Sequence, residues 1–90
     1  MENGNMKKTT LNIKYYVPFD NLMNKTELLQ VKPGSKITDV FILLAKKYTG
    51  FDAPNIFDRF VVFLNGMACR GESQVKEGDE VSIIAFLMGG

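Results

Sequence analysis

Apolar and polar residues alternate along residues 9–17, near the start of the chain. A period of two is typical of a β-strand with one buried and one exposed face. The apolar members that we expect to face the core are Leu11, Ile13 and Tyr15. Pro18 should end this strand, because it has no backbone N–H to donate to a sheet. Residues 26–31 predict a second strand, and the short connection favours an antiparallel pair.

A helix is predicted over residues 38–48, because apolar residues recur there at spacings of three and four. The members of this expected core face are Ile37, Val40, Phe41, Leu44, Ala45 and Tyr48. Ile42 and Leu43 widen the apolar face further, which favours a well-buried helix.

Both ends of this helix carry boundary signals. Ser35 or Thr38 is expected to cap the exposed N–H groups at its start, and Asp39 suits the positive end of the helix dipole. Gly50 is predicted to lie in the C-terminal cap region, and Pro54 should prevent the helix from continuing.

Three more strands are predicted after the helix. Residues 60–64 are strongly apolar, and Asn65-Gly66 is the preferred dipeptide of a two-residue hairpin turn, whose central residues need positive φ. Residues 67–70 should return as a short strand, and a polar turn at residues 76–79 precedes the closing strand. The order predicts an α+β fold in which one helix packs across a mixed sheet of four or five strands.

Length and composition exclude several classes of site. Ninety residues make one small domain, which we assign to residues 9–88, after a disordered leader at residues 1–8. A net charge of +1 predicts no nucleic-acid partner, and no apolar run approaches the roughly 20 residues of a membrane span. The chain has no histidine and one cysteine, so we expect no metal site, no internal disulfide and a cytoplasmic setting.

The chain ends in Gly89-Gly90, which we expect to be a flexible tail. Glycine has no Cβ, so a terminal carboxylate on such a narrow backbone can enter the active site of another protein. The simpler alternative is a frayed chain end. Two glycines alone do not decide between a tail that enters an active site and a frayed end.

The order of elements and the tail resemble the β-grasp fold of ubiquitin-like proteins, and within it the MoaD/ThiS family of sulfur carriers. The strongest segment runs from residues 78–81 through Ile83-Ile84 to the two glycines, and the supporting segments are residues 32–35, 44–48 and 64–66. Residues 13–16 and the length of 90 residues look nearer the MoaD branch. Ala85-Phe86 stands where MoaD-type tails usually carry a proline pair, and an apolar residue there is nearer ThiS-type tails.

This resemblance implies that the chain is a substrate and carrier rather than an enzyme, with no bound cofactor of its own. A ubiquitin-activating-type adenylyltransferase would use ATP to adenylate the carboxylate of Gly90, next to Gly89, and sulfur would then replace AMP to give a thiocarboxylate. The acceptor would be the large subunit of a molybdopterin synthase, with this chain as the small subunit, or thiazole synthase. The alternative is a ubiquitin-like modifier that is joined through Gly90 to lysines of target proteins.

An apolar docking surface is expected beside the tail. If residues 60–64 and the closing strand are neighbours, alternation places their outward residues on one face, and such exposed apolar surface usually marks an interface. The expected partner-binding residues are Phe63, Ile84 and Phe86, together with Leu87 and Met88. The alternative is that loops of the chain cover this face. Cys69 is expected to be a small buried apolar residue rather than a sulfur relay.

Overall fold

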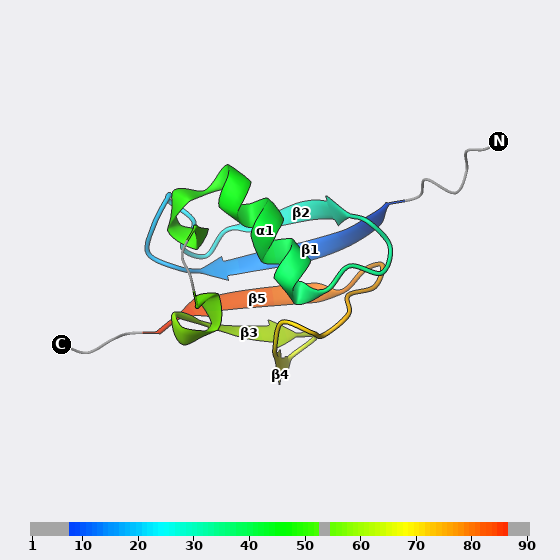
Figure 1. The fold of residues 1–90 in the computed structure, drawn as a ribbon. Coiled ribbons are helices and arrows are strands. Elements are labelled where there is room, and N and C mark those ends of the chain that lie inside the picture. Colours follow the sequence, from blue (N-terminus) through cyan, green and yellow to red (C-terminus); the bar gives the residue numbers. More distant parts are fainter. Residues whose placement is uncertain (1–7, 53–54, 87–90) are drawn as a thin grey trace.

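The computed structural model describes residues 8–52 and 55–86, and in them five strands form one mixed sheet crossed by one α-helix (Figure 1). The elements in chain order are β1 (Thr9–Tyr16), β2 (Thr26–Val31), α1 (Ile37–Lys47), the short 3-10 helices η2 (Thr49–Phe51) and η3 (Ile56–Asp58), β3 (Phe60–Leu64), β4 (Met67–Cys69) and β5 (Glu80–Ala85). The predicted α+β architecture with one main helix is confirmed, and the sheet has five strands.

The last strand lies in the centre of the sheet, whose strand order is β2-β1-β5-β3-β4. β5 runs parallel to β1 and antiparallel to β3, while β1 pairs with β2 and β3 with β4 as antiparallel hairpins. Asn65 and Gly66 both have positive φ, at 51° and 85°, which confirms the predicted hairpin turn between β3 and β4. The strand β5 is therefore held on both sides by the rest of the fold.

The core fills the space between the sheet and α1. The inward residues of β1 and β5 alternate as predicted, and the helix contributes one apolar stripe. The side chains that are fully buried include Leu11, Ile13, Tyr15, Val40, Leu44, Val62, Val81 and Ile83. Several aromatic rings pack edge to face around Phe51, at centroid distances of 5.0 Å to Phe19 and 5.7 Å to Phe41.

Neither Ser35 nor Thr38 caps α1 and Gly50 is not its C-cap, whereas Asp39 lies in the first turn of the helix as expected. The backbone N–H of Lys36 donates to Oδ2 of Asp39 at 2.9 Å, so Asp39 closes the first turn. The hydroxyl of Thr38 instead donates to the carbonyl of Gly71 at 2.8 Å, which ties α1 to a distant loop. At the other end the chain leaves α1 through an extended Tyr48, and Gly50 lies inside η2.

The expectation of a helix buried on all its apolar positions is also wrong. Ile42 is 54% exposed, and Leu43 is half-buried. The reason is that the sheet covers only one face of α1, and a single helix on a single sheet leaves its opposite face to solvent. Ile42 lies on that uncovered face.

Leu44 and Ile42 give a matched test of this packing on the same helix. Leu44→Ala should lower the free energy of unfolding by roughly 2–5 kcal/mol, because Leu44 is 0% exposed and its loss leaves a cavity. Ile42→Ala should change it by no more than about 0.5 kcal/mol, as exposed substitutions do. Urea denaturation of both variants measures the difference, and equal midpoints would show that the packing of α1 is not as described.

Candidate functional site

The central strand β5 leads directly to the C-terminal segment. It ends at Ala85, and the N–H of Phe86 donates to the carbonyl of Arg59 at 2.9 Å, which extends the pairing with the start of β3. This end of β5 lies on the side of the molecule where η3 and the start of β3 are found (Figure 1). The predicted site residues Leu87, Met88, Gly89 and Gly90 lie outside the described residues.

The face of the sheet that points away from α1 carries an apolar stripe across its centre. We call this the outer face, and its apolar residues are Tyr16, Leu28, Val61, Phe63, Ala68 and Ile84. Ile84 pairs with Tyr16 on one side and with Val61 on the other, and Phe63 is diagonal to it. The structure therefore brings Phe63 and Ile84 together on neighbouring strands, as alternation predicted.

The outer face is less enclosed than the core face of the same strands. Phe63 and Ile84 are half-buried, whereas Val62 and Ile83 beside them are only 1% and 0% exposed. Nζ of Lys14 lies 3.5 Å from Oε1 of Glu80, and this solvated ion pair joins β1 and β5 on the same face. Such an exposed ion pair adds little to the stability of the fold. It borders the apolar stripe without burying it.

Phe86 lies beyond the end of β5, and 46% of its surface is exposed. It lines a hollow of about 230 Å³, which we call the tail hollow, together with Phe19, Gly50, Arg59, Phe60 and Ala85. The sequence patterns did not predict this hollow, because its walls come from four separate segments. The one feature that could have pointed to it is Gly50, a glycine that the helix end does not need.

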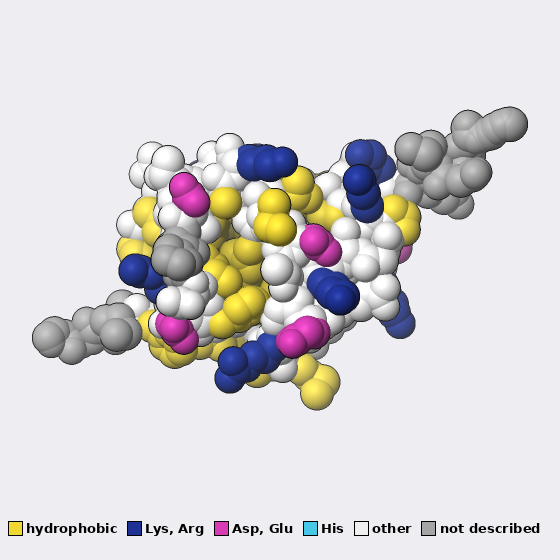
Figure 2. All heavy atoms as spheres, in the orientation of Figure 1, with side chains coloured by type: hydrophobic (Ala, Val, Ile, Leu, Met, Phe, Trp, Pro, Cys, Tyr) yellow, Lys and Arg dark blue, Asp and Glu magenta, His cyan; other side chains and the backbone are white. Residues whose placement is uncertain are grey.

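A second apolar area lies on the face that carries α1. Figure 2 shows hydrophobic side chains gathered beside the helix. A hollow of about 280 Å³ lies in this area. Its apolar walls are Phe41, Ile42, Ala45, Phe51 and Ile56. The tail hollow and the outer face lie next to the end of β5, whereas this area is on the opposite side of the sheet from the outer face.

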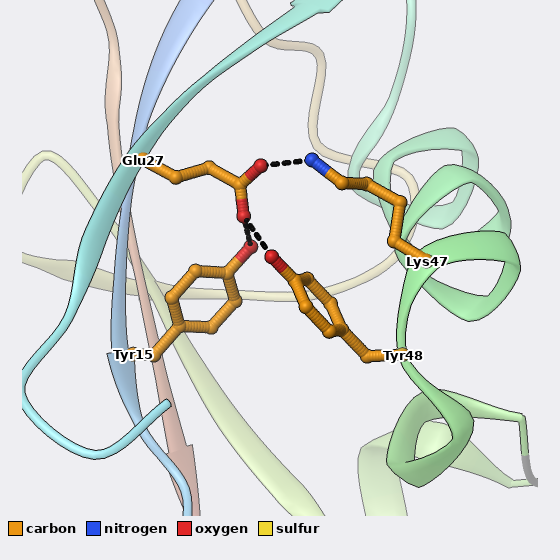
Figure 3. Close-up of polar contacts among 4 residues, drawn as sticks. All are labelled: Tyr15, Glu27, Lys47 and Tyr48. Carbon is orange, nitrogen blue, oxygen red and sulfur yellow. Dashed lines mark hydrogen bonds and ion pairs between the residues drawn. The ribbon is translucent and has the colours of Figure 1, made fainter. Parts of the chain in front are cut away.

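Four polar side chains join the sheet to the end of α1 (Figure 3). One carboxylate oxygen of Glu27 accepts hydrogen bonds from the hydroxyls of Tyr15 and Tyr48, both at 2.7 Å, and the other oxygen accepts from the ammonium of Lys47. Glu27 has the same strand parity as the buried residues Leu29 and Val31. The sequence signal that could have indicated this cluster is the acidic Glu27 at a core-facing position of a predicted strand.

The cluster shifts the pKa values of its members. Burial acts to raise the pKa of Glu27, but hydrogen bonds from Lys47, Tyr15 and Tyr48 outweigh it, so the pKa lies below its usual value. The hydrogen bond to Glu27, together with burial, raises the pKa of Tyr48 to about 12. Burial, followed by the same carboxylate, raises the pKa of Tyr15 well above its usual value. All of these pKa shifts favour an ionised Glu27 carboxylate that accepts hydrogen bonds from the neutral hydroxyls of Tyr15 and Tyr48.

Stability should therefore depend on pH through Glu27. A carboxyl whose pKa is lowered by folding stabilises the protein above its unfolded value of 4.5, and this stability is lost as pH falls through the lowered value. Glu27→Gln should cost about 1.5–3 kcal/mol at pH 7, as the loss of hydrogen bonds to a charged group does. Thermal denaturation from pH 7 to pH 3 should show the difference from the parent shrinking, while exposed Glu72→Gln should stay within about 0.5 kcal/mol throughout.

Cys69 is half-buried and packs against the core, on the inward side of β4. Burial raises the pKa of its thiol, and the opposing hydrogen bond with Ser73 is the smaller effect. A thiol with a raised pKa is a poor nucleophile at neutral pH. Among the described residues, no group of three acidic, cysteine or histidine side chains could hold a metal ion. No described helix has the length and apolar character needed to cross a membrane.

Comparison with known proteins connects this geometry to a family. The model of the ThiS family matches residues 13–90, from β1 to the last glycine. The chain belongs to the ThiS family. The search of curated proteins gave no significant match.

Solved structures show that this ThiS-family chain has a ubiquitin-like β-grasp fold. SAMP1 from Haloferax volcanii is 18% identical with a TM-score of 0.73, over 90% of this chain and 99% of that one. A putative molybdopterin converting factor subunit 1 from Pyrococcus furiosus is 18% identical with a TM-score of 0.70, over 86% and 97%. A ubiquitin from Caldiarchaeum subterraneum is 18% identical with a TM-score of 0.61, over 93% and 100%.

Proposed function

We propose that this ThiS-family protein is a sulfur carrier whose reacting group is the carboxylate of Gly90. The observation that carries the proposal is the position of β5. The central strand of the sheet ends at Ala85, five residues before the last glycine, and the family match continues through that glycine. A rigid sheet thus presents a short segment whose final two residues have no side chain.

The chemistry needs an activating enzyme, since an ionised carboxylate is a poor electrophile. A carboxylate oxygen of Gly90 would attack the α-phosphate of ATP and release pyrophosphate, forming an acyl-adenylate. Hydrosulfide delivered by a sulfur donor would then attack the acyl carbon, so that a C–S bond forms, the C–O bond to AMP breaks, and AMP departs to leave a thiocarboxylate. The adenylate has to be kept from water, so the tail must enter an enclosed site, and a residue larger than glycine would add bulk there.

The outer face is the proposed docking surface for the ubiquitin-activating-type adenylyltransferase. Phe63 and Ile84 form its centre and Phe86 lies between it and the tail, with Leu87 and Met88 completing the approach. Aromatic residues are enriched in the fully buried centres of interfaces. A single surface next to the tail would bring Gly90 into the enzyme in one orientation.

The proposed sulfur acceptor is a biosynthetic enzyme in the cytoplasm, where ATP is at hand. The family match supports thiazole synthase, and the Pyrococcus furiosus neighbour supports the large subunit of a molybdopterin synthase, with this chain as the small subunit. Both acceptors would take sulfur from the same thiocarboxylate. The chain itself needs no bound cofactor for either route.

A second function, protein modification through Gly90, is favoured by two of the structural neighbours. SAMP1 is named a small archaeal modifier protein, and another neighbour is named a ubiquitin. Modification starts with the same adenylation and differs only in the final acceptor, which is a lysine amine of a target protein.

A denaturing blot of cells that express an N-terminally tagged chain separates the two functions. A carrier should give one free band, because a thiocarboxylate adds almost no mass. A modifier should give a ladder of heavier species that disappears when Gly90 is deleted. We expect the single band, and a Gly90-dependent ladder would instead favour protein modification.

A further inference from the structure

The tail hollow lies where the central strand stops, and its walls are fixed by close packing. The Phe19 ring packs edge-on against Phe51, with centroids 5.0 Å apart, and against Phe60 at 6.0 Å. A Cβ on Gly50 would come within 2.3 Å of the ring carbons of Phe19. Gly50 is therefore required for Phe19 to occupy this position, and Phe19 in turn forms one wall of the hollow.

The tail hollow is apolar except at one point. Arg59 is the one charged residue among its described lining residues, and it forms no ion pair with another described side chain. Its carbonyl accepts the hydrogen bond from the N–H of Phe86, so the backbone of Arg59 is held directly beside the start of the C-terminal segment. An apolar site with one cation fits an apolar side chain that has a carboxylate next to it.

The length of the C-terminal segment decides which molecule comes close enough to fill this hollow. Four residues follow Phe86, so Gly90 lies at most about 14 Å away, at roughly 3.6 Å for each extended residue. An enzyme that encloses the carboxylate of Gly90 must itself surround this segment. Its surface therefore reaches the hollow whenever the tail is in position to react.

We propose that the tail hollow receives an apolar side chain of the activating enzyme, and that a neighbouring carboxylate of that enzyme pairs with Arg59. This inference rests on the proposed function, because it assumes that Gly90 is adenylated. The contact would hold the start of the tail in one place, so that the few residues after Phe86 lead into the active site from a fixed point. Arg59 would act as a specificity-determining residue, distinct from the outer face.

The test uses two substitutions in the hollow and two matched controls. Arg59→Glu reverses the charge, and Arg70→Glu makes the same change at an exposed arginine after β4. Ala85→Leu fills the hollow from β5, and Ala45→Leu adds the same volume to the separate hollow beside α1. Each full-length variant is assayed by ATP–pyrophosphate exchange with every ubiquitin-activating-type adenylyltransferase of the source organism, purified and tested separately.

We expect Arg59→Glu and Ala85→Leu each to raise the KM for the chain about tenfold or more, as the loss of an interface anchor does. The effect of Arg59→Glu should shrink at 1 M salt, because screening weakens charge interactions, whereas that of Ala85→Leu should persist. Both control variants should match the parent. Thermal midpoints show whether each variant is folded, and if Ala85→Leu is not, Arg59→Glu decides by itself.

Two failures are distinguishable in this assay. If the parent chain supports exchange and both hollow variants match their controls, the hollow is not a docking site and the proposed function stands. If no adenylyltransferase exchanges pyrophosphate with the parent, the proposed function is wrong and the inference falls with it.

Discussion

Deletion of Gly90 should abolish ATP-dependent adenylation of the chain and leave its fold unchanged. The new carboxylate would belong to Gly89 and would be displaced by up to about 3.6 Å along the tail. A misplacement of about 1 Å can already lower a rate about a hundredfold, so the shortened chain should react at least that much more slowly. The last fully buried residue among those described is Ile83, so the core does not depend on the deleted residue.

Pyrophosphate exchange measures this effect, and circular dichroism with thermal denaturation confirms the fold. Deletion of Glu2 is the control for loss of one terminal residue, and it should react like the parent. One alanine added after Gly90 should also prevent adenylation, because it shifts the carboxylate the other way and brings a Cβ to the reacting end. Equal rates for the shortened, extended and parent chains would show that the carboxylate of Gly90 is not the reacting group.

Phe86→Asp should abolish productive binding to the activating enzyme with little change in thermal stability. Phe86 is 46% exposed and follows the central strand, so a carboxylate there stays solvated in the free chain but is desolvated in the proposed complex. Loss of an interface hot spot costs about 2 kcal/mol or more, so kcat/KM should fall by a factor of about 30 or more.

Ile42→Asp is the matched control for this substitution. Ile42 is 54% exposed on α1, which lies on the opposite side of the sheet from the outer face. It should therefore tolerate the same apolar-to-acidic change without loss of adenylation. If Phe86→Asp lowers the thermal midpoint strongly, Phe86 supports the fold instead. If both variants are adenylated like the parent, the enzyme docks on another surface.

Local patterns were sufficient to predict the individual elements of this fold. The alternation in β1, the three-four spacing in α1 and the Asn65-Gly66 turn each depend on neighbouring residues, and the structure confirms all three. The central place of β5 in the sheet was not predicted. Strand order depends on pairing between distant segments, which periodicity does not record.

The errors arose where tertiary contacts override local preference. Thr38 was expected to cap its own helix, but it bonds to Gly71, which is 33 residues away. Ile42 was expected to be buried, but no other layer covers its side of α1 in the described part of the chain. Glu27 accepts hydrogen bonds from Tyr15 and Tyr48, which lie 12 and 21 positions away from it in the sequence. A local sequence pattern could therefore not reveal the cluster.

Only part of the candidate site was predictable from the sequence. Alternation placed Phe63 and Ile84 on one face of adjacent strands, and the register of β3 and β5 confirms this arrangement. The tail hollow was not predictable, since it depends on Phe19 packing over Gly50 from a distant loop. The roles of all these residues in binding remain predictions.

The most direct test of the carrier function is intact-mass spectrometry of the full-length chain after incubation with its activating enzyme, ATP and a sulfur donor. The mass of a sulfur carrier should increase by the difference between one sulfur and one oxygen atom, and fragmentation should place this change on Gly90. A Cys69→Ser chain should gain the same mass, because the thiol takes no part. An unchanged mass in a chain that the enzyme does adenylate, or added sulfur that maps to Cys69, would contradict the account.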